Sequence, residues 1–192
     1  MKKKSERADD VAAGQTLARL ERLARLMRSA SHTERLNAAQ WEALRYLSRA
    51  NSFSNSPGAL TRYLGATKGT TSQTVLSLIK KGLIAKSLRG DDGRSVVLTF
   101  TETGQKNLGE DPLLSLGKAI GKLGDKTSKR FAKGLSELLE REITQQGGPS
   151  FGNCGACFYA AKHQSEIHCK VLNVNVGADD AQKLCVHHKA KP

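Results

Sequence analysis

The chain lacks the features that mark a membrane protein or one of the common enzyme classes. Its 192 residues contain no apolar run long enough to span a bilayer, and Met1-Lys2-Lys3-Lys4 is not followed by an apolar signal region. We therefore expect a cytoplasmic protein with no membrane partner. The sequence also has no G-x-S-x-G, P-loop, dinucleotide-binding glycine or H-E-x-x-H motif, which argues against an enzyme.

Negative charge is scarce as well. The 18 acidic residues face 31 Lys and Arg, so the formal net charge is +13 at pH 7. Such an excess favours a polyanionic partner such as nucleic acid. Hydrophobic residues make up 38% of the chain, which is enough for an ordinary core, and the length allows one domain plus an appendage.

The stretch from Ser56 to Phe100 predicts two short helices followed by a β-hairpin. Ser56-Pro57 is a helix start, with a side-chain oxygen at the N-cap and proline at the first helical position. Gly65 can take the left-handed conformation that ends a helix, and Thr67 is suited to cap the next one. We expect helices over residues 56–64 and 68–81 and strands over residues 83–88 and 95–100. This order is the ground plan of a winged helix-turn-helix.

The polar face of the second helix and the tip of the hairpin form the expected DNA-contacting surface. Short hydroxyl and amide side chains near a helix N-terminus suit base edges in a major groove, and cations neutralise phosphate. Asp92-Gly93 lies between two apolar runs and marks the hairpin turn, so arginines at its tip could enter a minor groove. The residues expected to contact double-stranded DNA are Lys68, Thr70, Ser72, Gln73, Ser77, Arg89 and Arg94.

Apolar residues recur at helical spacing on both sides of this stretch. We expect helices over residues 11–30 and 38–48 before it, with Trp41, Leu44 and Leu47 as core, and a polar loop over residues 51–56. A charged tail should precede residue 11. After the hairpin, helices are expected over residues 101–109, 111–123 and 128–144. The last helix places apolar residues along one side: Phe131, Leu135, Leu138, Leu139 and Ile143.

A series of residues keeps a fixed order and spacing from Leu36 to Gly104. It comprises Leu36-Asn37-Ala38-Ala39-Gln40-Trp41, Leu44, Leu60, Leu64-Gly65, Lys81-Gly82-Leu83, Asp92-Gly93-Arg94, and Phe100-Thr101 with Gly104. This series resembles the multiple-antibiotic-resistance regulator (MarR) family of bacterial transcription factors. The resemblance puts residues 68–77 on the recognition helix and Arg94 on the wing. Two departures are Phe100, where the family usually has leucine, and a recognition helix poor in arginine.

The same resemblance implies a quaternary structure and a mode of action. In the MarR family the first helix and the last two pack with those of a second subunit, so a two-fold homodimer is expected. Such a dimer would bind a pseudo-palindromic operator as a repressor, with its recognition helices about 34 Å apart.

We expect two units with a linker between them. Residues 11–146 should form the winged helix-turn-helix domain, with a DNA-binding core over 36–104 and dimerisation helices over 11–30 and 101–146. Gln145-Gln146-Gly147-Gly148-Pro149-Ser150 has the composition of a linker, and residues 147–192 should form a small cysteine-rich module that binds metal. The expected fold class is mainly α with a small β-hairpin wing (α+β).

All four cysteines lie in that last unit, with the spacing C-x2-C-x11-C-x15-C. In a reducing cytosol, clustered cysteines argue against structural disulfides and for metal binding or redox chemistry. Four thiolates complete the ligand set of a tetrahedral zinc or of an iron–sulfur cluster. A bound metal would also supply folding energy to a segment too short to be held by burial alone. The expected ligands are Cys154, Cys157, Cys169 and Cys185.

The pattern around the cysteines favours the cluster over zinc. Zinc modules usually bring two C-x2-C pairs, whereas this chain has one pair and two single cysteines. The runs Asn153-Cys154-Gly155-Ala156-Cys157-Phe158-Tyr159, His168-Cys169-Lys170-Val171-Leu172 and Leu184-Cys185-Val186 resemble high-potential iron–sulfur proteins, which implies a [4Fe-4S] cluster. That family buries its cluster among many aromatic residues, and the aromatic residues near these cysteines are Phe151, Phe158 and Tyr159. The flanking histidines are expected to support the ligands or to lie on the surface: His163, His168, His187 and His188.

Two modes of control are open. In the first, the module binds an iron–sulfur cluster that reports redox state, oxygen, nitric oxide or iron supply and changes the spacing of the recognition helices. In the second, the module holds a structural zinc, and a small organic acid in the cleft between the dimerisation and DNA-binding parts controls the protein.

Overall fold

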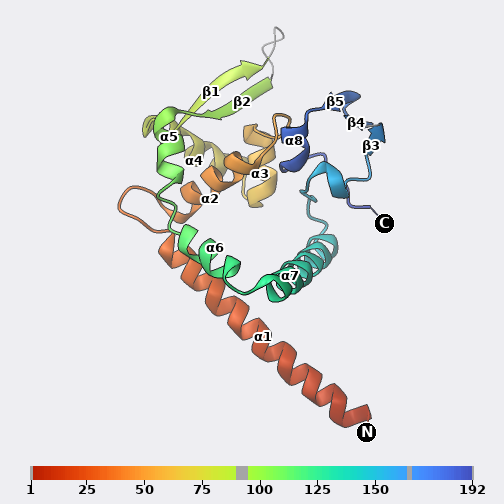
Figure 1. Cartoon of the computed structure of the whole chain (residues 1–192). Helices are drawn as coiled ribbons and strands as arrows, with labels where there is room; N and C mark the ends of the chain where they lie inside the picture. Colours follow the sequence, from red (N-terminus) through yellow and green to blue (C-terminus); the bar gives the residue numbers. More distant parts are fainter. Residues whose placement is uncertain (1, 90–94, 164–165, 192) are drawn as a thin grey trace.

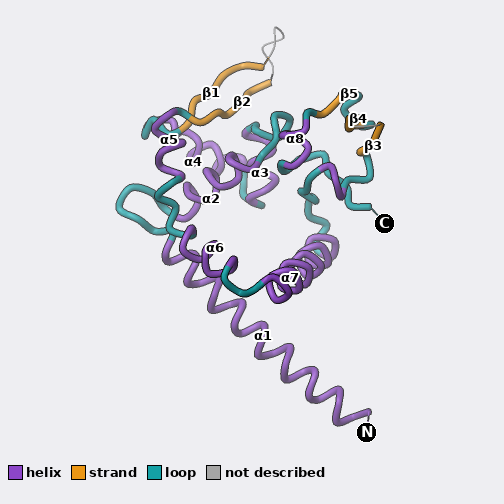
Figure 2. The backbone as a smooth tube through the Cα atoms, viewed as in Figure 1, coloured by secondary structure: helices purple, strands orange, loops and turns teal. Residues whose placement is uncertain are grey.

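A winged helix-turn-helix forms the centre of the molecule. The structure, a computed structural model, describes residues 2–89, 95–163 and 166–191, without the side chains of residues 2–9, Arg89 and His163. Three helices and a hairpin build the centre (Figure 1): α2 (Ala38–Arg49), α3 (Pro57–Leu64), α4 (Lys68–Lys80), β1 (Ile84–Arg89) and β2 (Ser95–Phe100). The predicted fold class, mainly α with a small hairpin wing, is confirmed (Figure 2).

Four further helices flank the centre: α1 (Lys2–Ala30), α5 (Glu102–Leu108), α6 (Leu114–Gly121) and α7 (Asp125–Gln145). The expected charged tail before residue 11 is wrong, because α1 already begins at Lys2. The Lys, Glu, Arg and Ala residues of this segment are good helix formers and continue the helix. None of the helices described is long and apolar enough to cross a membrane.

Local caps set the helix boundaries. The side chains of Ser56, Thr67 and Thr101 each accept a hydrogen bond from a backbone N–H three residues on, as N-cap residues do. Gly104 lies so close to the start of the hairpin that a Cβ there would be 1.9 Å from Leu83 O. This glycine therefore lets α5 pack directly against the segment that joins α4 to β1.

The winged-helix core contains the residues that periodicity predicted. Trp41 and Leu44 are 2% and 0% exposed, and Leu47 is also buried. The loop over residues 51–56 has the polar sequence that we expected, but two of its polar residues, Asn51 and Ser54, are buried. They are covered by the C-terminal segment of the chain.

The C-terminal module has a small sheet of its own. Its elements are η1 (Cys154–Ala156), β3 (Ala160–His163), β4 (Glu166–Cys169), β5 (Val174–Val176) and α8 (Ala178–Gln182). The three strands are antiparallel in the order β3-β4-β5. A parallel β-bridge between Ala50 and Leu184 joins the module to the end of α2, so the module is docked on the winged helix.

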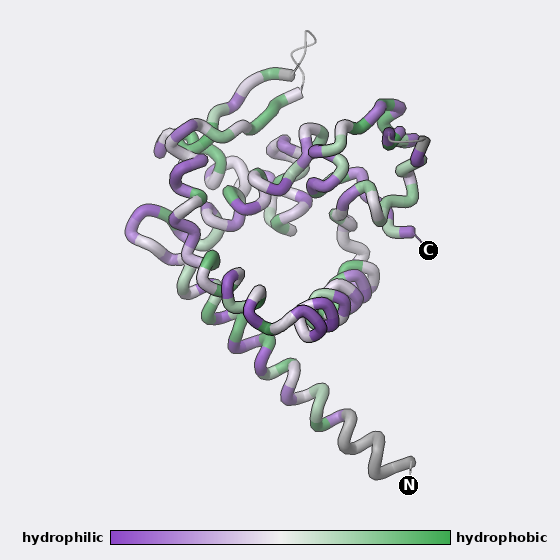
Figure 3. Tube along the Cα trace, in the orientation of Figure 1, coloured by the Kyte–Doolittle hydropathy of each residue, from purple (hydrophilic) through white to green (hydrophobic). Residues whose placement is uncertain are grey.

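The flanking helices leave apolar surface uncovered. In Figure 1, α1 extends away from the rest of the chain, and Figure 3 shows hydrophobic and hydrophilic residues alternating along it. Helix α7 has no buried residue, although its sequence is amphipathic. Its exposed apolar side chains include Phe131, Leu135, Leu138 and Leu139.

Candidate DNA-binding surface and cysteine site

The outer face of α4 carries most of the residues predicted to contact DNA. Thr67 caps this helix, since its Oγ1 accepts a hydrogen bond from Thr70 N at 3.1 Å. Thr71, Val75 and Leu78 are buried on the opposite face. The predicted contact residues that are exposed on α4 are Lys68, Thr70, Ser72 and Gln73. Two hydroxyls, an amide and an ammonium group therefore face solvent in the first half of one helix, which suits the edge of a major groove.

Ser77 lies further along the same helix and is held differently. It is half-buried, and its Oγ accepts a hydrogen bond from Gln40 Nε2 at 2.8 Å. Gln40 Oε1 in turn accepts from Asn37 N and closes the capping box of α2. The Ser77 hydroxyl thus fixes α4 against α2, and its predicted contact with DNA stays a prediction.

The wing is a regular hairpin. Strands β1 and β2 pair from Ile84 opposite Phe100 to Arg89 opposite Ser95. Arg89 is the last residue of β1, but its side chain lies outside the described residues, as does all of Arg94. The minor-groove role of both arginines stays a prediction.

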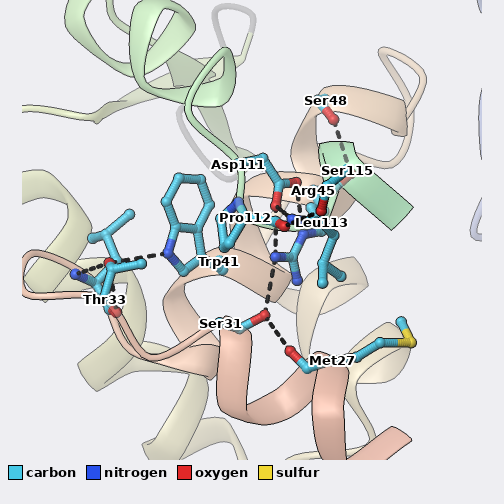
Figure 4. A network of polar contacts seen from close by, with 11 residues as sticks. Met27, Ser31, Thr33, Trp41, Arg45, Ser48, Asp111, Pro112, Leu113 and Ser115 are labelled. Atoms are coloured by element: carbon cyan, nitrogen blue, oxygen red, sulfur yellow. Dashed lines mark hydrogen bonds and ion pairs between the residues drawn. The ribbon is translucent and has the colours of Figure 1, made fainter. Parts of the chain in front are cut away.

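A pocket of about 660 Å³ opens between α1, α2 and α6, in the cleft where the alternative interpretation placed an organic acid. An ion pair lies in its lining (Figure 4). Arg45 Nε and Nη2 donate to Asp111 Oδ2 and Oδ1, each at 2.7 Å. Arg45 Nη2 also donates to Ser31 Oγ at 3.1 Å, and its guanidinium lies 5.8 Å from the centroid of the Trp41 ring. This pair connects α2 to the segment that leads into α6.

The surroundings of Asp111 favour its carboxylate form. Burial acts to raise its pKa, but the hydrogen bonds from Arg45 and from Leu113 N, together with the charges of Arg45 and Arg49, outweigh burial and lower the pKa. The Leu113 bond at 2.9 Å also turns the chain, so α6 begins at Leu114 instead of residue 111. Arg28 and Arg49 add positive charge to the pocket lining and Glu42 adds one negative charge, so the lining keeps a positive excess that suits an anionic ligand.

The structure brings the four cysteines into one region. Cys154, Cys157, Cys169 and Cys185 are 7–9% exposed, and all four are free thiols. Burial raises the pKa of the Cys154 thiol, and the other three thiols raise it further, because each would add like charge nearby. Within the described residues, no three or more His, Cys, Asp or Glu side chains converge on a position for one metal ion. The thiols are therefore neighbours, but they are not closed around a single ion.

The region is open to solvent on one side. A pocket of about 220 Å³ reaches Cys154, and its lining includes Lys162 and Lys191. Lys191 Nζ donates to Gly155 O at 3.1 Å, inside the C-x2-C turn. Positive charge at this opening would offset the negative charge of thiolate ligands.

Two of the four flanking histidines hydrogen-bond within the module. His188 Nδ1 is 2.7 Å from Ser150 Oγ, and its ring packs so closely that a Cβ on Gly152 would lie 2.7 Å from Nε2. His168 Nδ1 is 3.0 Å from Asn175 Oδ1. Burial lowers the pKa of His188, which favours the neutral form of its ring. His187 is exposed, and the side chain of His163 lies outside the described residues.

Sequence reasoning missed the long-range partners of both sites. Arg45 and Asp111 are 66 residues apart, and Ser54 and Val186, which join the winged helix to the cysteine module, are 132 residues apart. No local pattern marks any of these residues, so nothing in the sequence signalled the pairings.

Known proteins share the fold of this chain. The sequence model of the MarR family matches residues 36–95, and members of that family are transcription regulators, not enzymes. No curated protein matches the chain. A MarR transcriptional regulator from Methanosarcina mazei Go1 has a TM-score of 0.53 at 19% identity, over 69% of this chain and 96% of that one.

Two further solved structures are similar. For a MarR/EmrR family transcriptional regulator from Acinetobacter sp. ADP1 the TM-score is 0.53 at 23% identity, over 71% of this chain and 97% of that one. For the S. aureus MepR–DNA complex the TM-score is 0.51 at 16% identity, over 64% of this chain and 94% of that one. The chain therefore has the fold of the MarR winged helix-turn-helix regulators, and its residues 36–95 carry the sequence pattern of that family.

Proposed function

We propose that this protein is a transcription regulator that binds a pseudo-palindromic operator as a homodimer and acts as a repressor. The supporting observation is the exposed polar face of α4, with Lys68, Thr70, Ser72 and Gln73 next to a wing, on a chain of net charge +13. MepR, which shares the fold, is bound to DNA in its solved structure. Two such helices about 34 Å apart would enter successive major grooves on one side of the duplex.

The homodimer is supported by the uncovered apolar side of α7. Phe131, Leu135, Leu138 and Leu139 are 38–57% exposed in the single chain. An apolar stripe of this kind marks contact with another protein surface, and a second copy supplies it in the proposed dimer. Replacing Leu138 and Leu139 together with lysine should give a monomer by sedimentation and weaken operator binding. A dimer that survives this change would place the interface elsewhere.

Selection of bound sites from random duplex DNA tests the DNA-binding function directly. We expect a two-fold symmetric site, and an affinity for it that falls linearly on a log–log plot as salt concentration rises. A variant with Thr70, Ser72 and Gln73 all replaced by alanine should lose sequence preference but keep salt-dependent binding. Thr103→Ala, which changes an exposed hydroxyl on α5, is the matched control. Enrichment of no sequence by the wild-type protein would contradict the proposal.

We further propose that the four cysteines bind an iron–sulfur cluster, with [4Fe-4S] favoured, and that its gain or loss controls DNA affinity. The signal would be redox state, oxygen, nitric oxide or iron supply. Four buried cysteines in one module support a shared site, since the other three thiols are near enough to raise the pKa of Cys154. Their spacing, with one C-x2-C pair and two single cysteines, favours the cluster over zinc. When bound, the cluster supplies one-electron redox chemistry and sensitivity to oxidants.

Anaerobic purification separates the two metals. A brown protein with broad visible absorption, iron and acid-labile sulfide supports the cluster, whereas a colourless protein with one zinc per chain supports the structural-zinc alternative. Cys154→Ser, Cys157→Ser, Cys169→Ser and Cys185→Ser should each lose most of the metal, because an incomplete ligand set leaves an exchangeable position. A wild-type protein that takes up neither metal would overturn this part of the proposal.

The pocket between α1, α2 and α6 supports a second mode of control. Its volume of about 660 Å³ suits a small molecule, and Arg28 and Arg49 in its lining favour an organic acid. Benzoate is a suitable probe. It should raise the melting temperature and weaken operator binding in the wild-type protein, and both effects should be smaller in Arg49→Ala. No change in melting temperature at millimolar benzoate would count against this mode.

A further inference from the structure

Cys185 differs from the other cysteines because a neighbour of this residue is bonded to the winged helix. Ala50, directly after α2, forms a parallel β-bridge with Leu184. In this bridge Asn51 N donates to Leu184 O at 2.9 Å, and Leu184 N donates to Arg49 O at 2.7 Å. The residue before Cys185 is therefore fixed to the end of α2.

The residue after Cys185 is fixed as well. Val186 N donates to Ser54 Oγ at 2.8 Å in a buried environment. Ser54 is 0% exposed and is itself held on two sides, since its Oγ donates to Asn51 Oδ1 at 2.7 Å and its carbonyl accepts from Tyr46 Oη at 2.7 Å. The winged helix thus holds the backbone on both sides of Cys185, while the module holds Cys185 itself, whose N–H donates to Gly152 O at 2.9 Å.

The other three cysteines are positioned by the module itself. Cys157 N donates to Cys154 O at 3.2 Å in the turn between them. Cys169 is paired within the sheet, opposite Ala160 on one side and Val174 on the other. The ligand set is therefore divided: the module places three thiols, and the winged helix helps to place the fourth.

Hydrophobic packing crosses the same boundary in both directions. Phe53, from the loop between α2 and α3, packs against the module's cluster of buried residues, which includes Cys154 and Cys169. Val186, from the module, belongs to the winged-helix core. The winged helix thus adds an aromatic ring to the cluster of buried residues that includes two of the cysteines, which the sequence alone did not indicate.

The loop that makes these contacts leads directly to the DNA-binding elements. Asn55 O accepts a hydrogen bond from Leu98 N in β2 at 2.7 Å, and Ser56 is the N-cap of α3. Residues 53–54 are therefore followed directly by residues that bond to the wing and cap the first helix of the helix-turn-helix.

We propose that Phe53 and Ser54 complete the cysteine site from the winged-helix side, and that they couple its metal occupancy to DNA binding within a single chain. This inference rests on the proposed function of the four cysteines. Ser54 positions Cys185 through Val186, and Phe53 shields the site from solvent. Because such coupling is reciprocal, operator DNA changes the affinity for the metal by the same factor as the metal changes the affinity for DNA.

The test uses the full chain, reconstituted without oxygen with iron and sulfide. Ser54→Ala leaves the buried Val186 N–H without its acceptor, so a ferrous chelator should remove iron about tenfold faster than from the wild-type protein. In the wild type, we expect the operator affinities of loaded and metal-free protein to differ by about 5- to 150-fold. In Ser54→Ala this difference should become much smaller. This affinity ratio compares loaded and metal-free forms of the same variant, so a direct effect of Ser54→Ala on the DNA-binding core enters both affinities.

Two further variants make the result decisive. Phe53→Ala alters the module's cluster but lies outside the winged-helix core, so it should accelerate iron loss while the winged helix stays folded. Ser48→Ala, whose hydroxyl donates to Arg45 O within α2, is the matched control and should behave as wild type. Unchanged iron removal and an unchanged affinity ratio in both Ser54→Ala and Phe53→Ala would overturn the inference and leave the proposed cluster standing. A wild-type protein that binds no cluster would overturn both.

Discussion

Replacing Arg45 with methionine isolates the ion pair that joins α2 to the segment before α6. Methionine keeps apolar contact with Trp41, but Asp111 loses both 2.7 Å hydrogen bonds and keeps the one from Leu113 N. Removing one partner of a fully buried pair costs about 3–5 kcal/mol. Here the side chains are 16% and 11% exposed, so we expect the free energy of unfolding to fall by about 2–3 kcal/mol.

Thermal unfolding followed by circular dichroism measures this loss. For a chain of this size, the expected change lowers the melting temperature by about 5–10 °C. Lys106→Met is the matched control, because it breaks the 2.7 Å ion pair with Glu102 on the surface. The side chains of Lys106 and Glu102 are 76% and 82% exposed. That pair should be worth less than about 0.5 kcal/mol.

The pH dependence gives a second check on the reasoning. Because the pKa of Asp111 is lower in the folded than in the unfolded state, the pair adds stability above the unfolded value of about 3.9. That stability is lost as the pH falls through the folded value, so the difference between wild type and Arg45→Met should shrink below about pH 4. A difference of the same size at pH 7 and pH 3, or one no larger than that of Lys106→Met at pH 7, would refute the reasoning.

Three other variants test the fold and the DNA contacts. Gly104→Ala should destabilise the protein by about 3 kcal/mol or more in thermal unfolding, because its Cβ would meet Leu83 O, whereas Gly58→Ala, with nothing within 4 Å, should be nearly neutral. Arg94→Ala should reduce the salt dependence of binding by about one ion, and an unchanged slope would remove Arg94 from the phosphate contacts. Gln73→Ala should relax one base position in each half-site by about 1–3 kcal/mol, and an unchanged selected site would show that Gln73 reads no base.

Local signals predicted most of the winged helix. Ser56, Thr67 and Thr101 cap helices through bonds that span three residues, so the sequence itself shows them. Trp41 and Leu44 are buried because their spacing puts them on one face of α2, which periodicity also shows. Both kinds of interaction join residues within about one turn of helix, so the order of residues in the sequence is enough to predict them.

Contacts between distant segments were not predictable in the same way. Ser54 and Phe53 lie in a stretch that reads as an ordinary polar loop, and their surroundings depend on where the C-terminal module docks. Gln40 and Ser77 are 37 residues apart, and only the packing of α2 on α4 brings the amide to the hydroxyl. The cysteine spacing indicated one shared site, but it held no information on which part of the chain would hold Cys185.

The docking of Val186 into the winged-helix core has a consequence for truncated forms of the protein. A chain that stops after Gln146 would retain α1 to α7 and every residue predicted to touch DNA. It would also lose Phe151, whose ring packs edge-on against Tyr46, and leave the Ser54 hydroxyl without Val186, so the exposed core would favour aggregation. In genetic terms, a nonsense codon after position 146 should therefore behave as a null allele, and not as a regulator that has merely lost its sensor.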